Sequence, residues 1–375
     1  MKILQRHMSG TSRSKPKIVL FSAFYEPFMS GAEQMVKEIL EHLGSEYEMT
    51  LVTARIQKDL PKKEYRDTFT LVRVGFGSRF DKYLYPFLAP FAAKKLHPQV
   101  VHAILESYAG IALMFLRFVL PSAKRILTLQ SGGLDHEDKQ KNIFLRMFWR
   151  GIHVNPHKVT AISRFLASRG SSFRKDMVTI TPNGLDFSDV PGDTESIPGR
   201  IICVGRLSWV KGHKYLLEAW PQILRQFPGA QLVLVGEGEE RKNIERQIEN
   251  LHIEKSVKLL GNLPHKQVLE EMSKSEIFIC PSLAEGLGIV FIEAQACGVP
   301  VIGTRVGGIP DIIEDGKTGL LIEEKNSKEI EEAVFQLLHD ESLRKRFIEN
   351  AKNTVKSFEW KNILKDIKNI YEDSL

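Results

Sequence analysis

The chain has 375 residues, of which 43% are hydrophobic and 26% charged, and its formal net charge is +6. This composition excludes a disordered, collagen-like or disulfide-rich protein, and the length exceeds what one core usually organises, so we expect two domains. Residues 1–190 hold 28 basic and 17 acidic side chains, whereas residues 191–375 hold 24 and 29. The basic first half is typical of a protein with an anionic partner, such as phospholipid, a lipid-linked phosphate or a charged glycan, but a solvated face with spare lysines gives the same excess, and no motif indicates nucleic acid.

We expect no signal peptide in this sequence. Residues 1–16 are basic and polar and lack the apolar stretch of a signal peptide, so we expect a flexible tail there. The three cysteines, Cys203, Cys280 and Cys297, show neither metal-binding nor redox spacing. We therefore expect a cytoplasmic protein, with peripheral association at the inner face of a membrane as the position that the basic first half favours.

Two segments mix aromatic and cationic side chains, Phe80–Lys95 and Phe144–Arg150. Such segments can lie on a membrane surface, but helices that pack one face on the core and solvate the other show the same pattern. We expect the second arrangement. No run of eighteen apolar residues occurs.

The first half reads as strands alternating with helices. Strands are expected at Lys17–Ser22, Met49–Ala54, Thr70–Val74, Val100–Ala103, Arg125–Gln130, Lys158–Ala161 and Val178–Thr181. Helices are expected at Gly31–Leu43, Leu84–Leu96, Tyr108–Phe118 and Ser163–Gly170. This alternation predicts a parallel sheet covered by helices on both faces.

A second such series follows a break. Thr181–Asp186 interrupts the pattern and Asp189–Gly199 is rich in turn-forming residues. Strands are then expected at Arg200–Val204, Gln231–Val235, Val257–Leu260, Ile277–Cys280, Pro300–Gly303 and Leu320–Ile322, and Ser357–Leu375 has the spacing of an amphipathic helix. The sequence therefore predicts an α/β protein with two doubly wound domains, 17–186 and 187–356, and a terminal helix at 357–375.

A pair of cations follows the first strand of the second series. Arg206 and Lys211 stand at the carboxyl end of that strand and before a helix. Ligands of open α/β sheets bind at this edge, and the positive end of a helix favours anions. The two side chains are suited to holding a diphosphate and to stabilising its departing charge, and no Asp-x-Asp motif indicates a metal.

Two glutamates stand eight residues apart in Ser282–Thr304. Glu285 lies in a loop and Glu293 in the helix that follows, with Gly286 and Gly288 allowing close approach of the backbone to a ligand. Buried glutamates are rare unless paired, and carboxylates accept hydrogen bonds from sugar and ribose hydroxyls. We interpret the pair as ligand-positioning groups.

These features together resemble the retaining glycosyltransferases of the GT-B fold, in family 4, which includes sucrose-phosphate synthases and bacterial lipid and polysaccharide glycosyltransferases. The resemblance spans the chain after its tail. It rests on Ser30-Gly31-Ala32-Glu33, Val101-His102-Ala103, Ala161-Ile162-Ser163, Pro182-Asn183-Gly184-Leu185-Asp186, Gly205-Arg206 with Lys211-Gly212, Glu285 to Glu293, and Phe358-Glu359-Trp360.

The resemblance implies a hexosyl transfer, with retention and without metal or cofactor, from a nucleotide diphosphate sugar to a glycan or lipid-linked acceptor. Arg206 and Lys211 would hold the diphosphate, Glu293 the ribose and Glu285 the sugar hydroxyls. The backbone of Gly286, Leu287, Gly288 and Ile289 would bind sugar and phosphates, Gly31 would approach the diphosphate from the first domain, and the terminal helix would cross back onto that domain.

The sequence departs from the family at three places. Ser30 stands where a glycine is frequent, Leu287 where a phenylalanine is frequent, and Gln130 where a strand commonly ends in a histidine beside the sugar. Gln130 can hydrogen-bond a sugar hydroxyl but cannot take a charge. His102 and His136 are nearby in the sequence and could substitute for the missing histidine, although each is more typical of a structural histidine.

Three other functions were weighed against transfer. A glycoside hydrolase would use the two glutamates as acid and nucleophile, but leaves Arg206 and Lys211 unexplained. A non-catalytic subunit that binds nucleotide sugars or glycans stays open because of Gln130. A dinucleotide dehydrogenase is disfavoured because no Gly-x-Gly-x-x-Gly follows the first strand.

Overall fold

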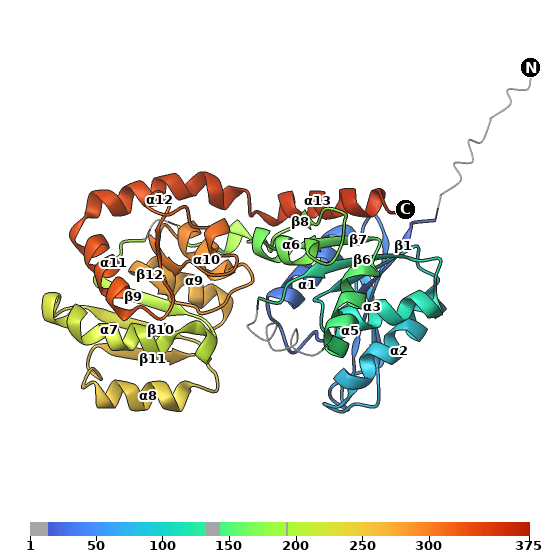
Figure 1. The fold of residues 1–375 in the computed structure, drawn as a ribbon, viewed down its shortest axis with the longest axis horizontal. Helices are drawn as coiled ribbons and strands as arrows, with labels where there is room; N and C mark the ends of the chain where they lie inside the picture. The colour runs from blue at the N-terminus through green and yellow to red at the C-terminus, as the bar shows by residue number, and fades with distance from the viewer. Residues whose placement is uncertain (1–13, 133–142, 193) are drawn as a thin grey trace, which may run out of the picture.

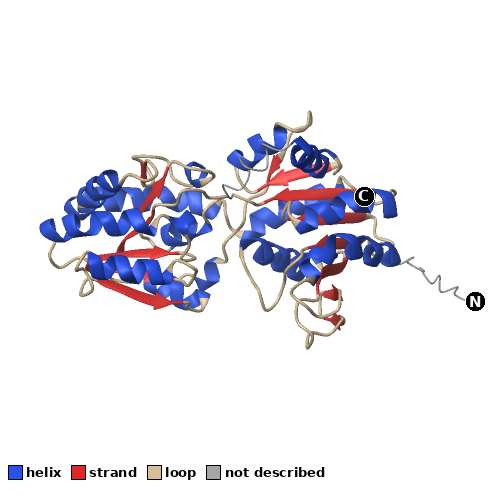
Figure 2. Cartoon of the chain, turned by 60° about the horizontal axis from the view of Figure 1, so that its bottom comes forward, coloured by secondary structure: helices blue, strands red, loops and turns tan. Residues whose placement is uncertain are grey.

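The computed structural model describes residues 14–132, 143–192 and 194–375. These residues form two sheets, one from each half of the chain, and helices cover both faces of each sheet (Figure 1, Figure 2). The α/β class and the two-sheet architecture expected from the sequence are therefore confirmed.

The first sheet has the strand order β3-β4-β2-β1-β5-β6-β7-β8. Its strands are β1 (Lys17–Phe21), β2 (Glu48–Ala54), β3 (Lys63–Tyr65), β4 (Phe69–Val74), β5 (Val100–Ile104), β6 (Lys124–Leu129), β7 (Lys158–Ala161) and β8 (Thr179–Ile180). Its helices are α1 (Gly31–Leu43), α2 (Asp81–Leu96), α3 (Tyr108–Val119), α5 (Ile143–Val154) and α6 (Arg164–Ser171). All strand pairs are parallel except β3–β4, which is antiparallel.

The second sheet is parallel throughout, with the order β11-β10-β9-β12-β13-β14. Its strands are β9 (Ile197–Val204), β10 (Gln231–Val235), β11 (Val257–Gly261), β12 (Ser275–Cys280), β13 (Val301–Thr304) and β14 (Leu320–Ile322). The helices are α7 (His213–Gln226), α8 (Arg241–Asn250), α9 (His265–Ser273), α10 (Ile289–Ala296), α11 (Ser327–His339) and α12 (Glu341–Lys356), with short 3-10 helices η1 (Phe187–Asp189), η2 (Trp209–Lys211) and η3 (Ile309–Asp311).

The last helix, α13 (Trp360–Glu372), leaves the second half and packs beside α1 of the first half (Figure 1). Its buried face is apolar and carries Tyr371, whose hydroxyl lies 2.8 Å from Nδ1 of His102 in β5. Lys368 pairs with Glu46, and Asp373 with Lys158. The chain therefore crosses between the halves twice, once near residue 190 and once near Phe358.

Strand β3 was not expected from the sequence. It has three residues, Lys-Glu-Tyr, and no apolar alternation marks it. It pairs with β4 at the edge of the sheet, where Glu64 forms an ion pair with the buried guanidinium of Arg73. A strand held by an ion pair and a neighbouring strand leaves no hydrophobic period in the sequence.

The segment Phe80–Lys95 packs one face on the core and exposes the other, as expected, but most of its aromatic side chains lie on the exposed face. Tyr85 is fully buried and donates its hydroxyl to the carbonyl of Val52. Phe80, Phe87 and Phe91, by contrast, are exposed. The helix buries small residues and prolines against the sheet and leaves the larger rings on the outside.

Candidate functional site

Each of the two sheets changes its winding direction at one point. The candidate site lies next to both of these switch points. In the first sheet β1 and β5 are neighbours, and in the second β9 and β12 are neighbours, so the connections from these strands leave in opposite directions. Ligands of open α/β sheets bind in the crevice that this reversal opens beyond the carboxyl ends of the strands. Gly31 follows β1, Lys211 follows β9 and Glu285 follows β12.

A cavity of about 390 Å³ lies between the two halves at this edge. The first half contributes Ser30, Gly31, Ala32, Leu105, Gln130, Gly132, Ile162 and Asn183, and the second contributes Arg206, Ser208, Val210, Lys211, Ala284, Glu285, Gly286, Leu287, Gly288 and Ile289. The cavity thus brings together every site residue expected from the sequence except Glu293.

Lys211 and Glu285 form an ion pair in this cavity, with their side chains 19% and 17% exposed. The pair joins the segments that follow β9 and β12 across the switch point of the second sheet. Burial by itself lowers the pKa of Lys211, but the adjacent Glu285 carboxylate, with smaller contributions from Cys280 and Cys203, outweighs burial and raises that pKa above its ordinary value. Lys211 therefore keeps a positive charge in a largely water-excluded site.

Arg206 lines the same cavity, but its guanidinium is mostly exposed and pairs with Glu239 at 3.0 Å. An exposed ion pair contributes little stability and exchanges readily for another anion. Glu239 therefore holds Arg206 only weakly at the edge of the cavity.

Glu293 lies in α10, one helical turn beyond Ile289 and on the same side of the helix. Its carboxylate is almost fully buried and lies 3.0 Å from Nε2 of His265, at the start of α9. This hydrogen bond raises the pKa of His265. The two glutamates therefore have different partners and do not line one cavity together, which is not the arrangement of a hydrolase acid and nucleophile.

Glycines set the distance between the two halves. A Cβ on Gly132 would lie 2.0 Å from the backbone nitrogen of Gly286, and a Cβ on Gly286 would lie 2.9 Å from the carbonyl oxygen of Gln130. Gly288 has φ +91° at the residue before α10, a conformation that favours glycine. The Gly-Leu-Gly turn therefore allows the loop after β6 to touch the loop after β12.

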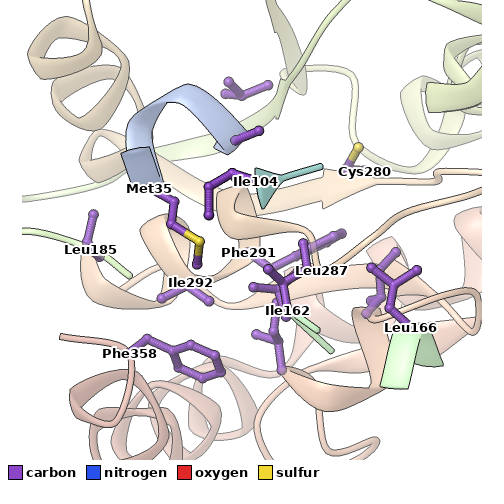
Figure 3. Close-up of a cluster of buried hydrophobic side chains, with 14 of the residues drawn as sticks. Met35, Ile104, Ile162, Leu166, Leu185, Cys280, Leu287, Phe291, Ile292 and Phe358 are labelled. Carbon is purple, nitrogen blue, oxygen red and sulfur yellow. The ribbon is translucent and has the colours of Figure 1, made fainter. Parts of the chain in front are cut away.

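Apolar contacts accompany these glycines. Leu287 is 3% exposed and belongs to a buried cluster that includes Met35 and Ile162 from the first half and Phe291 from the second (Figure 3). The cluster joins the halves behind the cavity. In addition, Arg164 donates its backbone N–H and its Nε to Asp311 in η3, at 2.5 and 3.0 Å.

Gln130 projects from the end of β6 and lies between two neighbours. Its Nε2 is 3.1 Å from Sδ of Met35, and its Oε1 accepts from Nδ2 of Asn183 at 3.5 Å. The capping box of α1 lies on the same wall, where Glu33 accepts the backbone N–H of Ser30 at 3.0 Å. Gln130, Asn183 and Ser30 line the cavity and offer uncharged hydrogen-bonding groups to a ligand.

Glu106, a side chain that supports the site, was not identified from the sequence. Glu106 follows β5 and is completely buried, where it accepts the backbone N–H groups of Gln130 and Ser131 and lies 3.6 Å from the guanidinium of Arg169. It therefore fixes the loop that carries Gln130 and Gly132. No motif surrounds it; a lone glutamate directly after a buried strand was the available signal.

The two histidines proposed as substitutes for a histidine at Gln130 do not take that place. His102 is buried in β5, with Nε2 2.7 Å from the Thr128 hydroxyl, and burial lowers its pKa to about 3. It is a neutral structural residue beneath α13. His136 lies outside the described residues.

Two family models match the chain in turn. "Glycosyltransferase Family 4" matches residues 29–189 and "Glycosyl transferases group 1" matches residues 194–354. An uncharacterized glycosyltransferase of Methanocaldococcus jannaschii is 30% identical over 67% of this chain and 69% of its own length. Other curated relatives match over 40% to 56% of their own lengths.

Solved structures share the fold. Sucrose-phosphate synthase from Thermosynechococcus elongatus superposes with a TM-score of 0.83 at 21% identity, covering 96% of this chain and 99% of that one. Anabaena HepE in complex with UDP-glucose superposes with a TM-score of 0.75 at 18% identity, covering 95% and 99%.

The architecture is therefore that of a GT-B glycosyltransferase, with two doubly wound sheets facing one cleft. Because the two models together match most of the chain, and the archaeal relative matches over more than two thirds of its length, the chain belongs to the group 1 glycosyltransferases of family 4. The resemblance expected from the sequence is confirmed.

Proposed function

We propose that this glycosyltransferase moves a hexosyl group, with retention and without a metal, from a nucleoside diphosphate sugar to a glycan or lipid-linked acceptor of cell-envelope or polysaccharide biosynthesis. The observation that carries the proposal is the Lys211–Glu285 pair, largely buried in the cavity between the halves. A protonated ammonium in a water-poor cleft is suited to a diphosphate, and its glutamate partner to sugar hydroxyls.

The donor would occupy the wall formed by the second half. Arg206 and Lys211 would hold the diphosphate, Glu285 the sugar hydroxyls and Glu293 the ribose, while the backbone from Gly286 to Ile289 would hold sugar and phosphate oxygens. Gly31 would allow close approach from the first half. HepE, which shares the fold, was solved with UDP-glucose, and this supports a nucleotide sugar as the donor.

In this reaction the bond between the sugar C1 and the diphosphate oxygen breaks, and the acceptor hydroxyl oxygen bonds to C1 on the same face. The acceptor proton passes to the departing phosphate, and the two cations stabilise the negative charge that develops there. Because Lys211 and Arg206 supply this charge, no metal is needed in the proposal. Gln130 would position a hydroxyl by hydrogen bonding.

We place the enzyme in the cytoplasm, where its thiols Cys203, Cys280 and Cys297 stay reduced, and at the inner face of the membrane when its acceptor is lipid-linked. No helix in the described part of the chain has the length and apolar character to cross a bilayer.

The experiment is a panel of nucleotide sugars with uridine, guanosine and adenosine bases, followed by release of the nucleoside diphosphate with and without cell-envelope extract. One donor should give release that the extract stimulates and that a chelator leaves unchanged. Lys211→Ala should lower kcat by about a hundredfold or more, the effect of removing one charge-stabilising donor.

Lys214→Ala is the matched control, since Lys214 is exposed in the same segment. Equal turnover of the Lys211→Ala variant and the wild type would contradict the site. Loss of turnover on adding a chelator would contradict the metal-independent mechanism, and inversion at C1 in the product would contradict retention.

A further inference from the structure

One face of helix α2 is apolar and exposed. Phe80, Tyr83, Leu84, Phe87 and Phe91, here called the aromatic face, recur at helical spacing on the side opposite to the buried residues of the helix. Phe80 is 74% exposed and Phe91 58%. Large aromatic side chains are costly to leave in water, so a face with several of them marks a contact with something outside the chain.

Neighbouring helix α3 extends this face. It packs beside α2 (Figure 1), and Phe115 contacts Phe87 with ring centroids 5.0 Å apart. Phe118, near the end of α3, is 76% exposed. The exposed rings therefore cover the outer surface of two adjacent helices rather than a single turn.

The exposed charge of the segment that forms this face is of one sign. Between Phe76 and Lys124 the sequence has six basic side chains, Arg79, Lys82, Lys94, Lys95, Arg117 and Lys124. Its two acids, Asp81 and Glu106, are both buried. Lys82 lies 4.9 Å from the ring centroid of Tyr83, and Arg117 lies 6.0 Å from that of Phe118. Each of the two helices thus carries a cation beside an exposed ring.

We propose that the aromatic face, with Phe118 and these cations, docks on the surface of a bilayer that contains anionic phospholipid. Exposed phenylalanine side chains enter the boundary between head groups and acyl chains, while lysine and arginine contact lipid phosphates. The opposite charges of protein and lipid identify the partner, because the rings alone would fit any apolar surface.

A second copy of the chain fits this surface poorly. A two-fold symmetric dimer through α2 would bring the Lys94 and Lys95 of one copy close to cations of the other, with no exposed acid between Phe76 and Lys124 to compensate. Like charges at close range are unfavourable. A bilayer surface supplies the missing negative charge.

The docking surface continues toward the catalytic cavity. A smaller cavity of about 130 Å³ is lined by Phe24, Phe28, Ile56, Gln57, Arg79 and Lys82. The loop that carries Phe24 and Phe28 runs on to Ser30 and Gly31 of the larger cavity. Phe24 also contacts Tyr108, which contacts Tyr83 of the aromatic face.

This smaller cavity joins two cations to two phenylalanines, a combination suited to an amphiphilic phosphate. A lipid-linked acceptor could place its phosphate there and its sugar or hydroxyl head beyond the loop in the larger cavity. This step toward the acceptor rests on the proposed function, whereas docking itself can be measured without any turnover.

The test is co-sedimentation of the full chain with vesicles of phosphatidylcholine alone and of equal parts phosphatidylcholine and phosphatidylglycerol. The protein should sediment with the anionic vesicles and stay in solution with the neutral ones. Salt should weaken the binding. Phe80→Ser with Phe91→Ser should lower the partition coefficient by about tenfold or more.

The doubly substituted Lys94→Glu, Lys95→Glu variant should lower anionic-vesicle partitioning by about twentyfold or more, because each basic side chain contributes severalfold near such a surface. Tyr65→Ser and Lys328→Glu are matched controls, with exposed side chains on β3 and α11, and should bind as the wild type does. An unchanged circular dichroism spectrum and an unchanged Tm report that each variant still folds.

Failure of the wild type to sediment with anionic vesicles would overturn the proposal, as would equal sedimentation of the aromatic-face variants. A stable dimer that the Phe80 and Phe91 substitutions dissociate would assign the face to a second copy instead. Vesicle binding by a protein that turns over no nucleotide sugar would refute the proposed function while leaving the docking surface intact.

Discussion

The two walls of the catalytic cavity differ in charge. The wall from the second half carries Arg206, Lys211 and Glu285, whereas all eight lining residues of the first half are uncharged. This contrast runs against the overall charge, since the basic side chains are in excess in the first half. The net charge of a segment therefore did not indicate the charge at its site. The excess basic side chains of the first half lie outside the cavity lining, and four of its cations, Lys82, Lys94, Lys95 and Arg117, are on α2 and α3.

The largest effect we expect comes from Glu285→Gln, which removes the negative charge from the charged wall. The variant leaves Lys211 in a mostly buried site without its partner, and breaking such a pair costs about 3 kcal/mol of unfolding free energy. Burial then dominates and lowers the pKa of Lys211 below its ordinary 10.5. Turnover should develop an alkaline decline that the wild type lacks, seen in the pH profile of kcat.

Glu293→Gln is the comparison variant, because Glu293 is buried on α10 but pairs with His265 instead of Lys211. Its profile should show no new alkaline decline. The same decline in both variants would mean that Lys211 does not depend on Glu285 for its charge.

The next effect concerns the uncharged wall. Gly132→Ala would place a methyl group 2.0 Å from the backbone of Gly286, so the two halves must separate locally. Misplacement by about an ångström between reacting groups lowers rate by roughly a hundredfold. We expect kcat to fall by this order, measured by nucleoside diphosphate release.

Gly229→Ala is the matched substitution, since nothing lies within 4 Å of a Cβ added there. It should leave kcat unchanged. Full activity of Gly132→Ala would show that the close approach between the halves is not needed for turnover.

A stability effect is expected where α13 meets β5. The pKa of His102 is about 3 in the folded protein and 6.5 ordinarily, so the unfolded chain binds the extra proton between these values. The contribution of neutral His102 to the free energy of unfolding is fully present above pH 6.5. It is lost as the pH falls toward 3, by about 1.4 kcal/mol for each pH unit. His102→Gln should flatten the acid limb of Tm against pH.

Exposed His339 at the end of α11 provides the control for this measurement. His339→Gln should keep the wild-type acid limb. If His102→Gln also kept it, protonation of His102 would not limit stability in acid.

The smallest effect is expected at His265, which is half exposed. Its hydrogen bond to Glu293 raises its pKa, so its stabilising contribution is complete below pH 6.5 and is lost as pH rises through the raised value. Solvent screening keeps this contribution below about 1 kcal/mol. The Tm difference between wild type and His265→Gln should therefore be larger at pH 6 than at pH 9; a difference that grows with pH would contradict the assignment.

The charged wall was much more predictable from sequence than the neutral one. Lys211, Glu285 and the glycines between β12 and α10 form local patterns, in which a turn, a cation and a carboxylate stand at fixed spacing. The neutral wall depends on contacts across the fold: Glu106 acts through backbone groups of Gln130 and Ser131, and Gly132 matters because of Gly286, more than 150 residues away. Contacts between residues so far apart produce no recognisable spacing pattern in the sequence.

The strands were predictable because a strand of a parallel sheet is buried on both faces and reads as a continuous apolar run. Most helices were predictable from the spacing of their apolar residues. The side of α2 that faces solvent was not predictable from the sequence, because apolar residues occur all around this helix. A sequence with rings on both faces does not say which of them the sheet covers, and the packing of Pro86, Ala89 and Pro90 against the sheet settles it.

The return of α13 to the first half also has a consequence for synthesis. His102 and Tyr371 are hydrogen-bonded partners separated by 269 residues. During translation the first half emerges long before the helix that covers it, and its docking site for Trp360–Glu372 stays open until the whole second half has left the ribosome. The first half is synthesised first but gains its last helix, α13, only at the end of translation. On a stalled ribosome, this half would therefore expose the surface that α13 covers.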